Sequence, residues 1–217
     1  MLAGNDFLCR WAADHAARAI CFRTVVDTDF YTPRSCPGGE PLVIGWSGSA
    51  STNHYLSIVM PVLDRLAERH HFVLRLVSDT REGIPFDACR RLRVEFTPWD
   101  SATELGDFRG FDVGLMPLPD DEWAYGKCAL KGLLYMACGV PAVCSTVGAI
   151  TTIVSDGETG CLAASDEEWR EKIERLLGDF ALRRRIAEKA RELVVSRYSL
   201  AVQAPRLLQI LQGLKPD

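Results

Sequence analysis

The sequence predicts an α/β protein whose main domain is doubly wound, with helices covering both faces of a parallel sheet. Between residues 41 and 163, short apolar runs alternate with helical patterns. Such alternation produces parallel strands joined by right-handed crossovers. The runs are apolar throughout rather than at every second position, as expected for strands that are buried on both faces. We therefore expect a Rossmann-like domain over residues 38–198.

The expected elements of this domain follow from the apolar runs and from helical periodicity. The expected strands are 41–46, 72–77, 92–96, 111–116, 141–144 and 160–163, and the expected helices are 52–68, 101–108, 127–138, 166–177 and 180–196. A last helix occupies the separate C-terminal segment 199–217.

The first 37 residues do not fit the sheet domain. They predict one helix over 5–17, one apolar strand over 19–26 and a turn-rich connector. A single strand without a neighbour in the sequence leaves its backbone groups unpaired. We interpret residues 1–37 as the remnant of a preceding domain together with a linker.

The composition excludes several classes of protein. The 217 residues are 47% hydrophobic and carry a formal net charge of −4, which is not the basic field that attracts nucleic acid. We find no signal peptide and no apolar run long enough to span a membrane. The eight cysteines show no C-x-x-C pair and no zinc-ligand spacing. We therefore expect free thiols, no bound metal and a location that is either cytoplasmic or, as part of a full-length enzyme, peripheral to the membrane.

Ligands of doubly wound sheets lie at the carboxyl ends of the strands. The turn Gly45-Trp46-Ser47-Gly48 follows the first expected strand, and its glycines would let the backbone approach an anion. The alternative is an ordinary capped turn between strand and helix. The turn matches neither a Walker loop nor a dinucleotide fingerprint. Pro98 and Trp99 follow the third strand, where an aromatic ring suits a nucleobase, although Pro-Trp-Asp also resembles a helix start.

Two lysines at the start of the helix expected over 127–138 are the most informative feature. Lys127 and Lys131 are four residues apart and share a face of that helix. A lysine near a helix N-terminus is unfavourable by roughly 0.3–1 kcal/mol, because that end carries partial positive charge. The pair makes sense if a pyrophosphate binds between them. The alternative is two solvated lysines that tolerate the repulsion.

Several segments, taken in order, resemble glycosyltransferase family 4, the "group 1" retaining glycosyltransferases of the GT-B fold. The segments are VVDTDFYTP, PLVIGWSGSASTNHYL, FDVGLMPLPDDEWAYGKCALKGLLYMACGVPAVCSTVGA, IVSDGETGCL and SRYSL. The resemblance covers roughly residues 20–200. It implies that this chain is the C-terminal half of a GT-B fold, which binds a UDP- or GDP-sugar, and that a glycan, lipid or small-molecule acceptor binds a separate N-terminal domain.

The resemblance also implies roles for individual residues. The Gly45–Gly48 turn would lie against the diphosphate, Pro98 and Trp99 would flank the base, and Lys127 and Lys131 would be the catalytic cations. The donor contacts would further include Leu130 and two positions, Gly126 and Leu134, where many members of the family have glutamates. No metal is implied, since side chains and the helix dipole neutralise the leaving group.

Because Gly126 and Leu134 depart from the family's pattern, three functions remain open. The first is the donor-binding half of a glycosyltransferase, incomplete as this chain and inactive unless the acceptor half is supplied by an N-terminal domain or a partner chain. The second is a non-catalytic nucleotide-sugar-binding module, which Gly126 and Leu134 favour. The third is an unrelated Rossmann-like enzyme such as a GT-B sugar epimerase.

Overall fold

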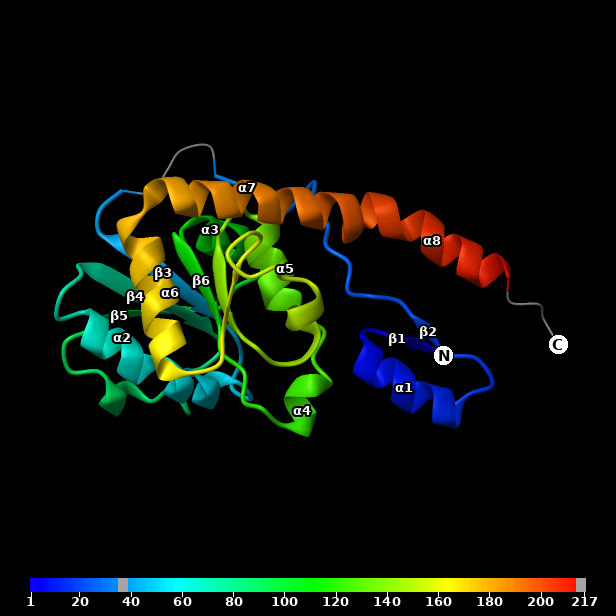
Figure 1. Ribbon diagram of the computed structural model, residues 1–217, viewed down its shortest axis with the longest axis horizontal. Coiled ribbons are helices and arrows are strands. Elements are labelled where there is room, and N and C mark those ends of the chain that lie inside the picture. Colours follow the sequence, from blue (N-terminus) through cyan, green and yellow to red (C-terminus); the bar gives the residue numbers. More distant parts are fainter. Residues whose placement is uncertain (35–38, 214–217) are drawn as a thin grey trace.

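The computed structural model describes residues 1–34 and 39–213, and its centre is a six-stranded parallel sheet (Figure 1). The strands lie in the order β5-β4-β3-β6-β7-β8. Their bounds are β3 Leu42–Ser47, β4 Phe72–Ser78, β5 Arg93–Pro98, β6 Val113–Met116, β7 Ala142–Ser145 and β8 Cys161–Ala163. All five neighbouring pairs are parallel, as the apolar runs predicted.

Helices cover both faces of this sheet. The helices are α2 Met60–Leu66, α3 Glu104–Arg109, α4 Glu122–Tyr125, α5 Leu130–Ala137, α6 Asp166–Gly178, α7 Phe180–Arg197 and α8 Leu200–Gln212. One hydrophobic core contains the buried side chains of α2 and α6, the other contains those of α3 and α5, and α7 contributes to both. Successive strand residues supply opposite cores: Ile44 packs with α2 and Val43 packs on the α5 side. The doubly wound class is confirmed.

Two expected helices differ from the structure. The helix expected over 52–68 is a 3₁₀ turn, η1 Asn53–Ile58, followed by α2. Pro61 causes the break, because a proline cannot donate a backbone hydrogen bond inside a helix but fits its first turn. The helix expected from residue 127 begins only at Leu130, and the short helix α4 precedes it.

The N-terminal unit, which we define as residues 1–24, contains β1 Leu2–Ala3, α1 Asp6–His15 and β2 Ile20–Cys21. The expectation of one unpaired strand over 19–26 was wrong, because β2 pairs in parallel with β1. The chain then leaves the unit and follows α7 (Figure 1), where Arg191 donates a 2.7 Å hydrogen bond to the carbonyl of Thr28.

Three general properties bear on function. Within the described residues, no helix is both long and apolar enough to cross a membrane. The seven cysteines in that part of the chain are free thiols, and Cys36 lies outside it. No group of three or more histidine, cysteine, aspartate or glutamate side chains suited to a metal ion occurs in residues 1–34 and 39–213.

Candidate functional site

A cavity of about 740 Å³ opens at the carboxyl edge of the sheet. Trp46 and Ser47 at the end of β3 and Leu115 and Met116 at the end of β6 form its floor. These strands are neighbours in the sheet although β4 and β5 lie between them in the sequence. The order therefore reverses between β3 and β6, which is where open α/β sheets bind their ligands.

The turn after β3 forms the first wall of the cavity, which we call the β3 wall. Asp79 holds this turn by accepting a 2.8 Å hydrogen bond from the Ala50 backbone N–H. Gly48 is required here because a Cβ atom would lie 2.2 Å from the Trp46 ring. The Ser47 hydroxyl is buried and has no hydrogen-bond partner within the described residues. An unpaired buried hydroxyl at a cavity is a candidate ligand contact.

Gly45 does not have the place expected from the sequence. It lies inside β3 rather than in the turn, and it is not among the residues that line the cavity. A Cβ atom at this position would lie 2.0 Å from the ring of Phe111. This glycine therefore makes room for packing against Phe111 and not for the approach of a ligand.

The second wall, which we call the α5 wall, carries both predicted lysines. Lys127 and Lys131 line the cavity, but only Lys131 lies in the helix, because α5 begins at Leu130. Ala129 precedes the helix with φ 58°, a left-handed conformation that costs a non-glycine residue about 1–3 kcal/mol. Its methyl side chain cannot cap the helix, so the first N–H groups of α5 remain available to an anion.

The two lysines have different surroundings. The Lys127 ammonium lies 5.6 Å from the centre of the Tyr55 ring and 5.7 Å from that of Trp123, so aromatic faces hold it. The Lys131 ammonium lies 3.4 Å from the Glu104 carboxylate and 5.5 Å from the Phe108 ring. Lys127 thus has no carboxylate within ion-pair distance among the described residues, whereas Lys131 has one.

Glu104 is a site residue that the sequence analysis missed. Its carboxylate lines the cavity and accepts hydrogen bonds from the Tyr31 hydroxyl at 2.5 Å and the Trp99 indole at 2.9 Å. Partial burial acts to raise the pKa of Glu104, but these donors and the lysine charge outweigh burial, so the pKa lies below its ordinary value. In the sequence, Glu104 is distinguished only by its position four residues before Phe108 in α3. A glutamate at that spacing is common in helices and does not indicate a site.

The residues proposed to flank the base separate in the structure. Trp99 lines the cavity with 44% of its surface exposed, and Glu104 fixes its indole. Pro98 ends β5 and is not among the lining residues. An exposed ring held at the mouth of a cavity provides a stacking surface for a flat ligand.

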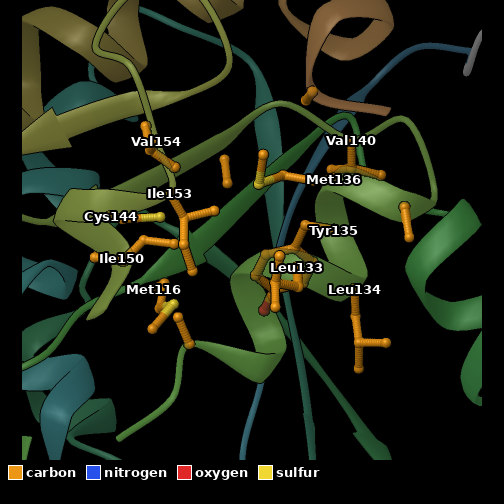
Figure 2. Close-up of a cluster of buried hydrophobic side chains, with 14 of the residues drawn as sticks. Met116, Leu133, Leu134, Tyr135, Met136, Val140, Cys144, Ile150, Ile153 and Val154 are labelled. Atoms are coloured by element: carbon orange, nitrogen blue, oxygen red, sulfur yellow. The ribbon is translucent and has the colours of Figure 1, made fainter. Parts of the chain in front are cut away.

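The positions on and before α5 also separate. Leu130 lines the cavity, whereas Gly126 and Leu134 do not. Gly126 ends α4. Leu134 is 4% exposed, and Figure 2 shows it on the opposite side of α5 from Ile150 and Cys144. A leucine so enclosed contributes to the hydrophobic core.

Fold and cavity together define the class of protein: a Rossmann-like α/β domain with a cavity at the reversal of its strand order, the position where such sheets bind ligands. The model of the family described as glycosyl transferases group 1 matches residues 41–179, and the chain therefore belongs to that family.

Curated relatives share part of the chain. The D-inositol 3-phosphate glycosyltransferase of Stackebrandtia nassauensis is 35% identical over 100 residues, which are 45% of this chain and 21% of that protein. The matched segment thus spans about a fifth of the relative's length.

Solved structures confirm the fold. HepE of Anabaena, solved in complex with UDP and glucose, matches with a TM-score of 0.78 at 16% identity, covering 98% of this chain and 62% of that chain. The C-terminal domain of a group 1 family glycosyl transferase from Francisella tularensis matches with a TM-score of 0.65 at 19% identity, covering 81% of this chain and 99% of that domain. The neighbours are GT-B glycosyltransferases, as the resemblance implied.

Proposed function

We propose that this chain is the donor-binding half of a retaining glycosyltransferase that moves a hexosyl unit from a UDP- or GDP-sugar to an acceptor. The observation that carries the proposal is the set of groups around one cavity: two lysines, the N-terminus of α5, the Ser47 hydroxyl and the Trp99 ring. Ammonium and N–H groups bind a diphosphate, and an indole face binds a base. The complex of HepE with UDP and glucose supports this choice of ligand.

The cavity supplies the electrostatics that sugar transfer requires. Negative charge develops on the departing diphosphate as the bond to the sugar breaks. Lys127, Lys131 and the N–H groups of α5 are fixed positive or partly positive groups on one wall. Groups oriented in advance toward the developing charge lower the barrier, because they need no reorganisation during the reaction.

We further propose that donor binding needs no metal ion. The two lysines already provide positive charge at the cavity, and a nucleoside diphosphate can be neutralised by such groups alone. Addition of EDTA is then expected to leave the affinity for UDP unchanged. A loss of affinity that Mg²⁺ restores would refute this part of the proposal.

The acceptor, whether glycan, lipid or small molecule, is proposed to bind a second half supplied by a further domain or a partner chain. The N-terminal unit supports this, since its sheet has only two short strands and Met1, Leu2 and Trp11 are exposed. HepE also extends beyond this match, which covers 62% of its chain. The free thiols support a cytoplasmic setting for the reaction.

A thermal-shift panel with UDP, GDP, ADP and their sugars tests the proposal. A ligand at about 100 times its dissociation constant adds roughly 2.7 kcal/mol to the free energy of unfolding. We expect UDP or GDP to raise the melting temperature and ADP to have the smaller effect. Absence of a shift with every nucleotide would contradict donor binding.

The second candidate is a non-catalytic nucleotide-sugar-binding module. The observation that favours it is Leu134, which is buried where many members of the family have a glutamate. The two candidates differ in turnover. Sugar transfer from a radiolabelled donor, measured after the acceptor half is supplied, would exclude the non-catalytic module.

A further inference from the structure

The loop that carries Lys127 is held from outside the sheet domain. Asn5 in the N-terminal unit is 2% exposed, and its side-chain amide donates hydrogen bonds to the backbone carbonyls of Tyr125 and Lys127, both at 3.0 Å. The side-chain oxygen of Asn5 accepts a 2.8 Å hydrogen bond from the Leu8 N–H and so caps α1. One buried side chain therefore starts a helix and fixes the backbone on both sides of Gly126.

Other contacts of the N-terminal unit hold the next residue of the loop. The Thr24 hydroxyl donates a 3.1 Å hydrogen bond to the carbonyl of Cys128. Gly4 lies so close to the same residue that a Cβ atom there would be 2.4 Å from the Cys128 sulfur. The carbonyls of residues 125, 127 and 128 are thus all bound by the N-terminal unit.

This loop needs such support. Ala129, directly after it, has a left-handed conformation that costs about 1–3 kcal/mol and persists only where the surroundings enforce it. The position of the Lys127 backbone also determines where its side chain can reach. With the carbonyl of Lys127 fixed, the ammonium lies at the cavity between the Tyr55 and Trp123 rings.

We propose that Asn5 is a positioning residue for the donor site and acts through Lys127. The proposal rests on the proposed function, since it assigns the two amide hydrogen bonds to the placement of a diphosphate-binding lysine. It also makes the N-terminal unit a part of the donor site. A displacement of that unit moves the Lys127 loop, and so couples the second half of the enzyme to donor binding.

The decisive variant is Asn5→Asp. Aspartate caps a helix as well as asparagine, but its carboxylate cannot donate to the carbonyls of residues 125 and 127. Asn5→Ser is the second variant, since serine also caps α1 and introduces no charge but is too short to reach those carbonyls. Circular dichroism establishes that both variants are folded at the temperature of the binding measurement.

The measurement compares UDP with uridine, and GDP with guanosine as a second pair. Because Lys127 is proposed to contact the diphosphate, both variants are expected to weaken binding of the nucleoside diphosphate about tenfold and to leave nucleoside binding unchanged. In a Lys127→Ala background, the Asn5 variants are expected to add less than about a twofold loss, because residues that act through one another are not additive.

Two results would overturn the inference. One is an equal loss for diphosphate and nucleoside, and the other is a full additional loss in the Lys127→Ala background; either would reduce Asn5 to a packing residue. Unchanged binding in both variants would overturn it as well. A wild-type chain that binds no nucleoside diphosphate would instead refute the proposed function, and this inference with it.

Discussion

The two walls of the cavity are built in different ways. The β3 wall is held within the sheet domain: Gly48 gives room to Trp46, two residues away, and Asp79 at the end of the neighbouring strand β4 fixes the turn. The α5 wall depends on distant parts of the chain, since Glu104 pairs with a lysine of α5 and Asn5 binds the loop before it from more than 100 residues away. Residues of the sheet domain thus shape the β3 wall, whereas the α5 wall also depends on a contact from the N-terminal unit.

The largest effect concerns Leu134, which lies in α5 but does not line the cavity. Leu134→Glu places at this position the carboxylate that the family resemblance implies. Because Leu134 is 4% exposed among apolar side chains, an unpaired charge there is expected to lower the free energy of unfolding by on the order of 3 kcal/mol. Leu134→Met is the matched control, with an expected cost below about 1.5 kcal/mol. Chemical denaturation measures both.

The same variant also tests whether the side chain can reach the ligand. We expect Leu134→Glu to bring no gain in UDP affinity, since Leu134 does not line the cavity. A stable variant that binds UDP more tightly than the wild type would show that this position belongs to the α5 wall after all.

A smaller effect is expected on the β3 wall. Ser47→Ala removes a buried hydroxyl that has no partner among the described residues. Its removal is expected to leave the free energy of unfolding unchanged or to raise it by about 1 kcal/mol, while UDP affinity falls about two- to tenfold. Chemical denaturation measures the free energy of unfolding, and calorimetry measures the UDP affinity.

Ser145→Ala is the matched control for that prediction. The Ser145 hydroxyl is also buried, but it accepts a 2.8 Å hydrogen bond from the Leu118 N–H. Its removal leaves a buried donor unpaired and is expected to destabilise the fold by about 1–3 kcal/mol. If Ser47→Ala destabilised the fold as much as Ser145→Ala, the Ser47 hydroxyl would have a structural role and not a role in ligand binding.

The smallest effect is a pH dependence on the α5 wall. Since the pKa of Glu104 is lowered in the folded state, its charge contributes stability above the ordinary glutamate pKa of about 4.3, and this contribution is lost as the pH falls through the folded value. At pH 7 the wild type is expected to have a higher melting temperature than Glu104→Gln. This gap in melting temperature is expected to close below about pH 4. A gap that is independent of pH would contradict the ion pair with Lys131.

The sheet was predictable because its signals are local. Each of the six strands overlaps an apolar run, and Gly139, which follows α5 with φ 66°, precedes Val-Pro in the sequence, a local signal for the end of a helix. Pro61 was a local signal too, and overlooking it produced one long helix in place of two short ones.

The site was less predictable because its determinants are distant. The start of α5 depends on the strained Ala129, which propensity gives no reason to expect. Glu104 reaches Lys131 across 27 residues, and the pairing of β1 with β2 involves only two residues in each strand. These contacts join residues that are far apart in the sequence, so no local sequence pattern predicts them.

Diphosphate binding in this cavity depends most on the two lysines, and one binding experiment tests them directly. Calorimetry would compare UDP binding by the wild type, by the double variant Lys127→Ala, Lys131→Ala, and by Lys189→Ala, whose lysine pairs with Glu158 on the surface. We predict at least about a hundredfold loss of affinity in the double variant and none in the Lys189→Ala control. A double variant that binds UDP as tightly as the wild type would contradict the assignment of this cavity to a diphosphate.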